Sequence, residues 1–201
     1  MRRILLSAAI AFAMLPMTGP AQESGPYKVL KRARVGGEGG WDYIYADSAG
    51  RRLYIPRRGS PSAAASDTRP AADAIPTRLS IYNLDTLELI TEIPGVGGNG
   101  AAVDPKSGHG FTSSRPVSMF DTKSMTLIKT IDVGKAAPDG IYFDPSNSRV
   151  YVFSHPTKDA TVIDAKDGTV LGTVDLGGVP EQAVGDGKGM LYVVSRTPRA
   201  V

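Results

Sequence analysis

The chain has 201 residues, with 23 basic and 20 acidic side chains, two histidines and no cysteine. The absence of cysteine excludes disulfides, thiolate metal sites, c-type haem attachment and a thiol nucleophile, and two histidines exclude a multi-histidine metal centre. The high content of Gly (23) and Pro (15), beside 41% hydrophobic residues, is typical of a globular β protein with many turns.

Residues 1–21 have the pattern of an export signal. Arg2 and Arg3 precede a short apolar run (4–15), and small residues follow at 19–21. The run is shorter than the about 20 apolar residues that a membrane span needs; the alternative is a buried N-terminal helix. Without the two arginines the formal charge falls from +3 to +1, which gives no electrostatic footprint for nucleic acid or an anionic membrane. We expect a periplasmic or secreted bacterial protein with no membrane span after signal removal.

After the signal, the chain repeats. Each unit opens with a strand that closes on Asp, continues through a polar turn, and holds further short strands rich in Val, Ile, Tyr and Thr. The first strands are expected at 41–47, 98–104, 138–144 and 180–186, and the second strands at 53–57, 110–114, 150–154 and 191–195. The third strands are expected at 79–83, 117–121 and 160–164, and the fourth strands at 87–93, 125–131 and 169–174.

The repeat predicts a β-propeller. The closing residues Asp104 and Asp144 lie 40 positions apart, and Asp144 and Asp186 lie 42 apart. Four antiparallel strands in about 40 residues describe one propeller blade. We therefore expect an all-β fold with about 3.5 four-stranded blades, formed by residues 22–201. Residues 57–77 are an insertion rich in Ala, Pro and Ser, which we expect to be a mobile loop.

The two ends of the repeat array raise a question of closure. Residues 27–37 resemble the fourth strands, so we expect an outer strand there that completes the last blade and covers a sheet edge. The last repeat stops after residue 195, which indicates a truncated or frame-shifted version of a longer propeller. A small propeller closed by dimerisation is the alternative.

The repeated phrases resemble the YncE-like, or YVTN-type, family of bacterial β-propellers over roughly residues 27–195. The resemblance lies in GGEGGWDYIYAD (36–47) with RRLYI (51–55), VSMFDTKSMTLIKTIDVG (117–134), the segment from PDGIYFD to VDLGG (138–178), and PEQAVGDGKGMLYV (180–193). The family is exported and seven-bladed and has no generally assigned enzymatic activity. The resemblance therefore implies a binding or scaffolding role.

Two sets of equivalent positions are candidates for a ligand-binding face. The position just before the innermost strand carries an acidic or amide side chain in every repeat: Asp42, Asn99, Asp139 and Glu181. In a ring these would surround the channel mouth, where they suit Ca²⁺ or the donor groups of a small ligand. The position just after the second strand carries an arginine or a histidine, which can become positively charged, in every repeat: Arg58, Arg115, His155 and Arg196. These would lie on the same face and suit a carboxylate or phosphate.

Each candidate also has a structural interpretation. Asp and Asn cap turns before strands, and Arg after a turn is ordinary surface. Trp41 could stack on a ligand or pack between blades. His155 could pair with Asp139 or Asp159 as a base or ligand, or it could be a solvated loop residue. The residue types leave the metal undecided.

We expect a binding or interaction protein that presents its channel mouth to a small ligand or a periplasmic protein, without a cofactor and without enzymatic activity. The first alternative is a propeller enzyme of the metal-dependent lactonase or quinone-dehydrogenase type, since carboxylates at the same mouth could hold a divalent ion. No identified nucleophile, base or cofactor clamp supports that alternative. The second alternative is a truncated product with no function of its own.

Overall fold

A computed structural model describes residues 26–66 and 71–196. The expected export signal, 1–21, lies outside the described residues. The chain divides into two units, 1–32 and 33–201. In the first unit, the described residues 26–32 are exposed and form no strand or helix. No helix in the described ranges is long and apolar enough to cross a membrane.

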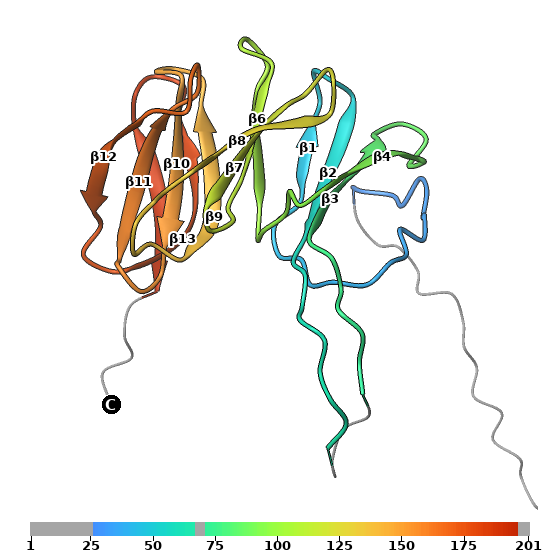
Figure 1. Cartoon of the computed structure of the whole chain (residues 1–201). Coiled ribbons are helices and arrows are strands. Elements are labelled where there is room, and N and C mark those ends of the chain that lie inside the picture. Colours follow the sequence, from blue (N-terminus) through green and yellow to red (C-terminus); the bar gives the residue numbers. More distant parts are fainter. Residues whose placement is uncertain (1–25, 67–70, 197–201) are drawn as a thin grey trace, which may run out of the picture. The chain divides into compact units, whose positions relative to one another are not determined.

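The second unit consists of antiparallel sheets whose strands follow one another in chain order (Figure 1). The first sheet contains β1 (Tyr45–Asp47), β2 (Arg52–Arg57), β3 (Arg78–Asn83) and β4 (Leu89–Pro94). The second contains β5 (Ala101–Asp104), β6 (His109–Thr112), β7 (Val117–Asp121) and β8 (Thr126–Ile131). The third contains β9 (Pro138–Asp144), β10 (Arg149–Ser154), β11 (Asp159–Asp164) and β12 (Val170–Asp175). A two-stranded sheet pairs β13 (Val179–Gly185) with β14 (Leu191–Arg196).

The first strands of successive sheets lie next to one another. β1 contacts β5, β5 contacts β9, and β9 contacts β13. Equivalent residues at the start of these four strands are therefore brought to one region, although successive ones lie 57, 40 and 42 positions apart in the sequence.

The turn after each first strand is held by the aspartate that closes the strand. The carboxylate of Asp104 accepts a hydrogen bond from the Lys106 N–H at 2.9 Å, and that of Asp144 accepts one from the Ser146 N–H at 2.9 Å. Both aspartates are buried. The closing aspartates thus act as the turn residues that the sequence predicts.

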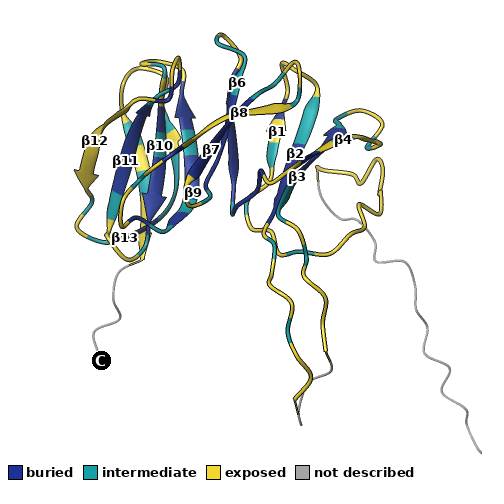
Figure 2. Cartoon of the chain, in the orientation of Figure 1, coloured by how far each residue is buried: buried dark blue, intermediate teal, exposed yellow. Residues whose placement is uncertain are grey.

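Two apolar layers hold the sheets together. Residues such as Tyr54, Leu79, Ile81 and Phe120 pack between the first and second sheets. The layer between the second and third sheets contains Phe111, Met119, Val117, Val150 and Ile163. Met119 and Phe120 are consecutive, and they contribute to opposite layers because side chains alternate across a strand. Figure 2 shows the buried middle strands of the third sheet beside the exposed β12.

The expected outer strand at 27–37 is wrong, because its described residues join no sheet. Part of this segment instead crosses the first sheet, and its carbonyl groups accept side-chain hydrogen bonds. Tyr82 Oη donates to the Val35 carbonyl at 2.8 Å, and Arg57 Nη2 donates to the Gly36 carbonyl at 2.8 Å. These contacts satisfy backbone groups that a neighbouring strand would otherwise pair.

The insertion at 57–77 continues the β2–β3 pair as a narrow arm (Figure 1). Ser60 and Ile75 exchange both backbone hydrogen bonds at 2.9 Å, and Ala63 and Ala72 exchange theirs at 2.8 and 2.9 Å. Most of its described residues are exposed. Residues 67–70 lie outside the described ranges, and the mobility of the insertion stays a prediction.

Candidate ligand-binding site

The inner strands bring three of the four equivalent acidic or amide residues into contact. Asn99 comes just before β5, Asp139 is the second residue of β9, and Glu181 is the third residue of β13. Asn99 Nδ2 donates to Asp139 Oδ1 at 3.0 Å and to the Pro138 carbonyl at 2.9 Å. The amide therefore fixes the orientation of the Asp139 carboxylate from the neighbouring sheet.

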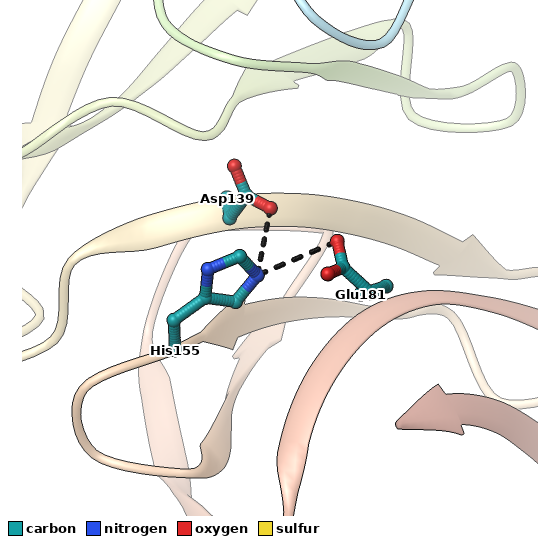
Figure 3. A group of neighbouring side chains, drawn as sticks. All are labelled: Asp139, His155 and Glu181. Atoms are coloured by element: carbon teal, nitrogen blue, oxygen red, sulfur yellow. Dashed lines mark ion pairs between the residues drawn. The ribbon is translucent and has the colours of Figure 1, made fainter. Parts of the chain in front are cut away.

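His155 follows β10 and lies between the two carboxylates (Figure 3). Its Nε2 is 2.9 Å from Asp139 Oδ2 and 3.5 Å from Glu181 Oε2. The predicted pairing with Asp139 is present, whereas Asp159 instead accepts a hydrogen bond from Thr157 Oγ1 at 2.6 Å. Although Nε2 is fully buried, it makes no hydrogen bond of acceptable geometry among the described residues.

Tyr43, which sequence reasoning missed, replaces the expected Asp42. Tyr43 Oη donates to Glu181 Oε2 at 3.0 Å and is 3.5 Å from Asp139 Oδ2. Asp42 is exposed and acts on the group only through its charge. A signal was available, because the positions equivalent to Tyr43 hold Gly100, Gly140 and Gln182. We call Tyr43, Asn99, Asp139, His155 and Glu181 the mouth cluster.

Burial and mutual contacts shift the pKa values of three residues in the mouth cluster. Burial raises the pKa of Asp139; the His155 imidazole opposes this shift, and the carboxylates of Asp42 and Glu181 reinforce it. For Glu181, burial raises the pKa, but hydrogen bonds from Arg196 and Tyr43 outweigh burial and leave the pKa below its usual value. Burial and the hydrogen bond to Glu181 raise the pKa of Tyr43 far above its usual value. Tyr43 is therefore a neutral donor at neutral pH.

The predicted basic positions separate into two pairs. His155 and Arg196 contact the mouth cluster, where Arg196 forms an ion pair with Glu181. Arg58 and Arg115 instead line a cavity of about 680 Å³ between the first and second sheets. Asn99 lines the same cavity, so the cavity and the mouth cluster are adjacent.

The cavity wall is rich in hydroxyl groups and free of acids. Its polar side chains, apart from the arginines and Asn99, are those of Thr77, Ser113, Ser114, Ser118 and Thr130. Neither Arg58 nor Arg115 has an ion pair with a described carboxylate. The arrangement suits an anion, because two arginines line a polar space without acidic partners among the described residues, although the guanidinium group of Arg58 lies against Gly40.

Trp41 lies apart from the mouth cluster. It is 55% exposed and lines an apolar hollow of about 270 Å³ on the first sheet, with neighbours that include Val35, Ile44 and Leu53. The structure therefore places Trp41 against the first sheet and not against the carboxylates. The second histidine, His109, donates a hydrogen bond from Nδ1 to the Ala165 carbonyl at 3.0 Å, which is a structural contact.

Comparison with known proteins establishes the fold. No family model and no curated protein matches the chain. The structure is similar to the WD40 β-propeller domain of Doa1, with a TM-score of 0.53 and 12% sequence identity, over 75% of this chain and 45% of that chain. This chain thus spans less than half of that domain. At this identity the match shows the β-propeller fold alone, and 607 solved chains match, so function must be argued from the site.

Proposed function

We propose that this β-propeller is a binding protein of the YncE-like kind that takes up a small carboxylate-bearing ligand in the cavity beside the mouth cluster. The observation that carries the proposal is the pair Arg58 and Arg115, which line an acid-free cavity and have no described acidic partner. A guanidinium group binds a carboxylate through two parallel hydrogen bonds, which fixes the orientation of the ligand. A dicarboxylate would engage both arginines.

The cavity wall supports the same ligand class. Ser113, Ser114 and Ser118 place hydroxyl groups around the cavity, and a hydroxyl can donate to a carboxylate oxygen. Ser113 is already occupied by the Asp139 carbonyl, to which its Oγ donates at 2.5 Å. Ser114 and Ser118 contact each other at 3.2 Å and can redirect a hydroxyl proton toward a ligand.

We propose a binding role and not a catalytic one. The only described imidazole near the cavity, His155, faces two carboxylates and hydrogen-bonds to no described hydroxyl, so this imidazole activates no described hydroxyl nucleophile. A propeller hydrolase would need such a pair or a metal-activated water. Turnover of simple esters or lactones by the purified full chain would contradict this assignment.

The ligand proposal is tested by titrating the full chain with succinate, monitored by calorimetry. We expect saturable binding that weakens at least tenfold in Arg58→Gln and in Arg115→Gln. Arg149→Gln is the matched control, because Arg149 is an exposed arginine at the opposite end of its sheet. No binding of succinate, citrate or phosphate to the wild type would contradict the proposal, and so would equal weakening in the control.

We further propose that the protein acts after export to the periplasm or outside the cell. The basic and apolar pattern of residues 1–21 and the YncE-like resemblance support this location. Cell fractionation of the tagged chain should recover it outside the cytoplasm, and Arg2→Glu/Arg3→Glu should retain it inside. Cytoplasmic recovery of the unaltered chain would contradict the proposal.

A further inference from the structure

We infer that Asp139, His155 and Glu181 form a binding site for a divalent transition-metal cation, with Zn²⁺ as the best-fitting ion. The inference goes beyond the carboxylate-binding proposal and uses different residues. The three side chains come from β9, the residue after β10, and β13, so two adjacent sheets supply them (Figure 3).

The spacing of the ligand atoms fits one ion. One ligand atom from each residue lies within 4.8 Å of the other two. The His155 Nε2 atom is 2.9 Å from Asp139 Oδ2 and 3.5 Å from Glu181 Oε2. A tetrahedral ion with bonds of about 2.0–2.1 Å to nitrogen and oxygen separates its ligands by about 3.3 Å. The two separations from His155 Nε2 lie on both sides of that value, and the third, between the two carboxylates, is at most 4.8 Å, so side-chain rotation would have to bring the ligands onto the ion.

The buried Nε2 atom of His155 faces the two carboxylates as a metal-ligating nitrogen would. It has no hydrogen bond of acceptable geometry among the described residues, although two carboxylate oxygens lie close to it. A metal ion between the nitrogen and the two oxygens would bind all three atoms at once, whereas the present ion pair with Asp139 lacks good hydrogen-bond geometry.

Neighbouring residues hold the remaining carboxylate oxygens away from the site. Asn99 Nδ2 donates to Asp139 Oδ1, which leaves Oδ2 facing His155. Arg196 forms its ion pair with Glu181 Oε1, which leaves Oε2 facing His155. Tyr43 Oη, in contrast, donates to Oε2 itself at 3.0 Å, and a carboxylate oxygen keeps a second lone pair for the ion. Such outer contacts orient metal ligands and keep their lone pairs directed at the ion.

The ligand types select the class of metal. Ca²⁺ and Mg²⁺ take oxygen ligands, whereas an imidazole nitrogen with two carboxylates suits Zn²⁺ and other first-row ions. Three protein ligands leave a fourth position for water or a ligand atom. The side chains of His155 and Asp139 are 30% and 13% exposed, so solvent reaches that position.

The alternative occupant is a proton, which would make His155 a cation bridging two carboxylates. A metal site takes up one metal ion per chain, whereas a protonated His155 between two carboxylates takes up none. The first experiment is calorimetric titration of the metal-free full chain with Zn²⁺ and, separately, with Ca²⁺ at neutral pH. We expect one Zn²⁺ per chain and much weaker Ca²⁺ binding.

Variants locate the site. His155→Gln and Asp139→Asn should weaken Zn²⁺ binding at least 100-fold, and Asn99→Ala should weaken it about tenfold as a positioning residue. His109→Gln and Asp159→Asn are matched controls that should leave binding unchanged. Co²⁺ added to the wild type should give visible absorption bands of a four- or five-coordinate site, which tests the inference even where a variant unfolds.

Two results would overturn the inference: no stoichiometric Zn²⁺ or Co²⁺ binding by the wild type, or loss of binding in His109→Gln with retention in His155→Gln. The outcome is separable from the carboxylate proposal. Succinate binding that depends on Arg58 in chelator-treated protein supports that proposal whether or not Zn²⁺ binds.

Discussion

Gly140 sets how closely β9 and β13 approach one another. A Cβ atom at this position would lie 1.9 Å from the Glu181 carbonyl oxygen, so only glycine allows the two inner strands their present separation. This approach brings Glu181 to Asp139 and His155. The absence of a side chain at Gly140 therefore allows the side chains of Asp139, His155 and Glu181 to come together.

Gly140→Ala should therefore separate the last sheet from the third. We expect a loss of about 2–3 kcal/mol in the free energy of unfolding, the range of a severe overpacking. Gly100→Ala is the matched control at the equivalent position, where the nearest atom, Ile141 Cγ2, would be 3.2 Å from the new Cβ. Urea denaturation of both variants checks this, and equal losses would contradict it.

Glu92 provides the clearest pH dependence outside the mouth cluster. The hydrogen bond from Ser80 Oγ, 2.6 Å long, lowers the pKa of Glu92; burial opposes this, and Arg78, whose Nε donates at 2.9 Å, adds to it. Folding therefore favours the ionised carboxylate. Its stabilisation is present above the ordinary pKa of 4.5 and is lost as the pH falls through the lowered value.

Glu92→Gln should cost about 0.5 kcal/mol at pH 7, a small value because the carboxylate is 40% exposed. The difference from the wild type should shrink as the pH falls below 4.5 and disappear once the pH has passed the lowered pKa of the folded state. The exposed Glu88 of the same hairpin is the control, and Glu88→Gln should have no effect at either pH. Thermal unfolding across pH checks this. A deficit that persists in acid would contradict the electrostatic explanation.

At the residue scale, the repeat alignment predicts contacts that depend on register. It places Asn99, Asp139 and Glu181 together because equivalent positions of adjacent inner strands meet. It does not predict Tyr43. Whether this long side chain reaches Glu181 depends on the direction of the backbone where it enters the first strand, and the alignment does not contain that direction. For the same reason it mistakes Asp42 for a member of the cluster.

At the scale of the elements, strands with their own partner in the same repeat are predicted well. The strands from β2 to β14 match the expected segments because each is bounded by an Asp, Gly or Asn turn. The segment 27–37 has the same apolar pattern as the fourth strands, but its residues pair with no strand in the structure. A local pattern cannot show whether a partner edge exists, so this prediction fails.

The arm formed by the insertion should be dispensable for the first sheet. Replacing residues 61–74 with Asn-Gly would join Ser60 to Ile75, which already exchange both backbone hydrogen bonds, through a two-residue hairpin turn. We expect the free energy of unfolding to change by less than about 1 kcal/mol, since most of the described arm is exposed. A larger loss in denaturant titration would show that the arm supports the sheet.

At the scale of the whole molecule, the propeller assembles a site that no single repeat contains. The mouth cluster takes residues from the entries of four repeats, and the neighbouring cavity takes one arginine from each of the first two. Sequence repetition therefore predicts where the mouth cluster lies. The chemistry comes from positions at which the repeats differ, such as Tyr43 and His155.

The most direct test of the central claim, that the inner strands build a cation-binding mouth, is an anomalous difference map from crystals of the full chain soaked in ZnCl₂. The account predicts a peak about 2.0–2.2 Å from Asp139 Oδ2, His155 Nε2 and Glu181 Oε2. A map with no peak there, while zinc is bound at His109 or at lattice contacts, would contradict it.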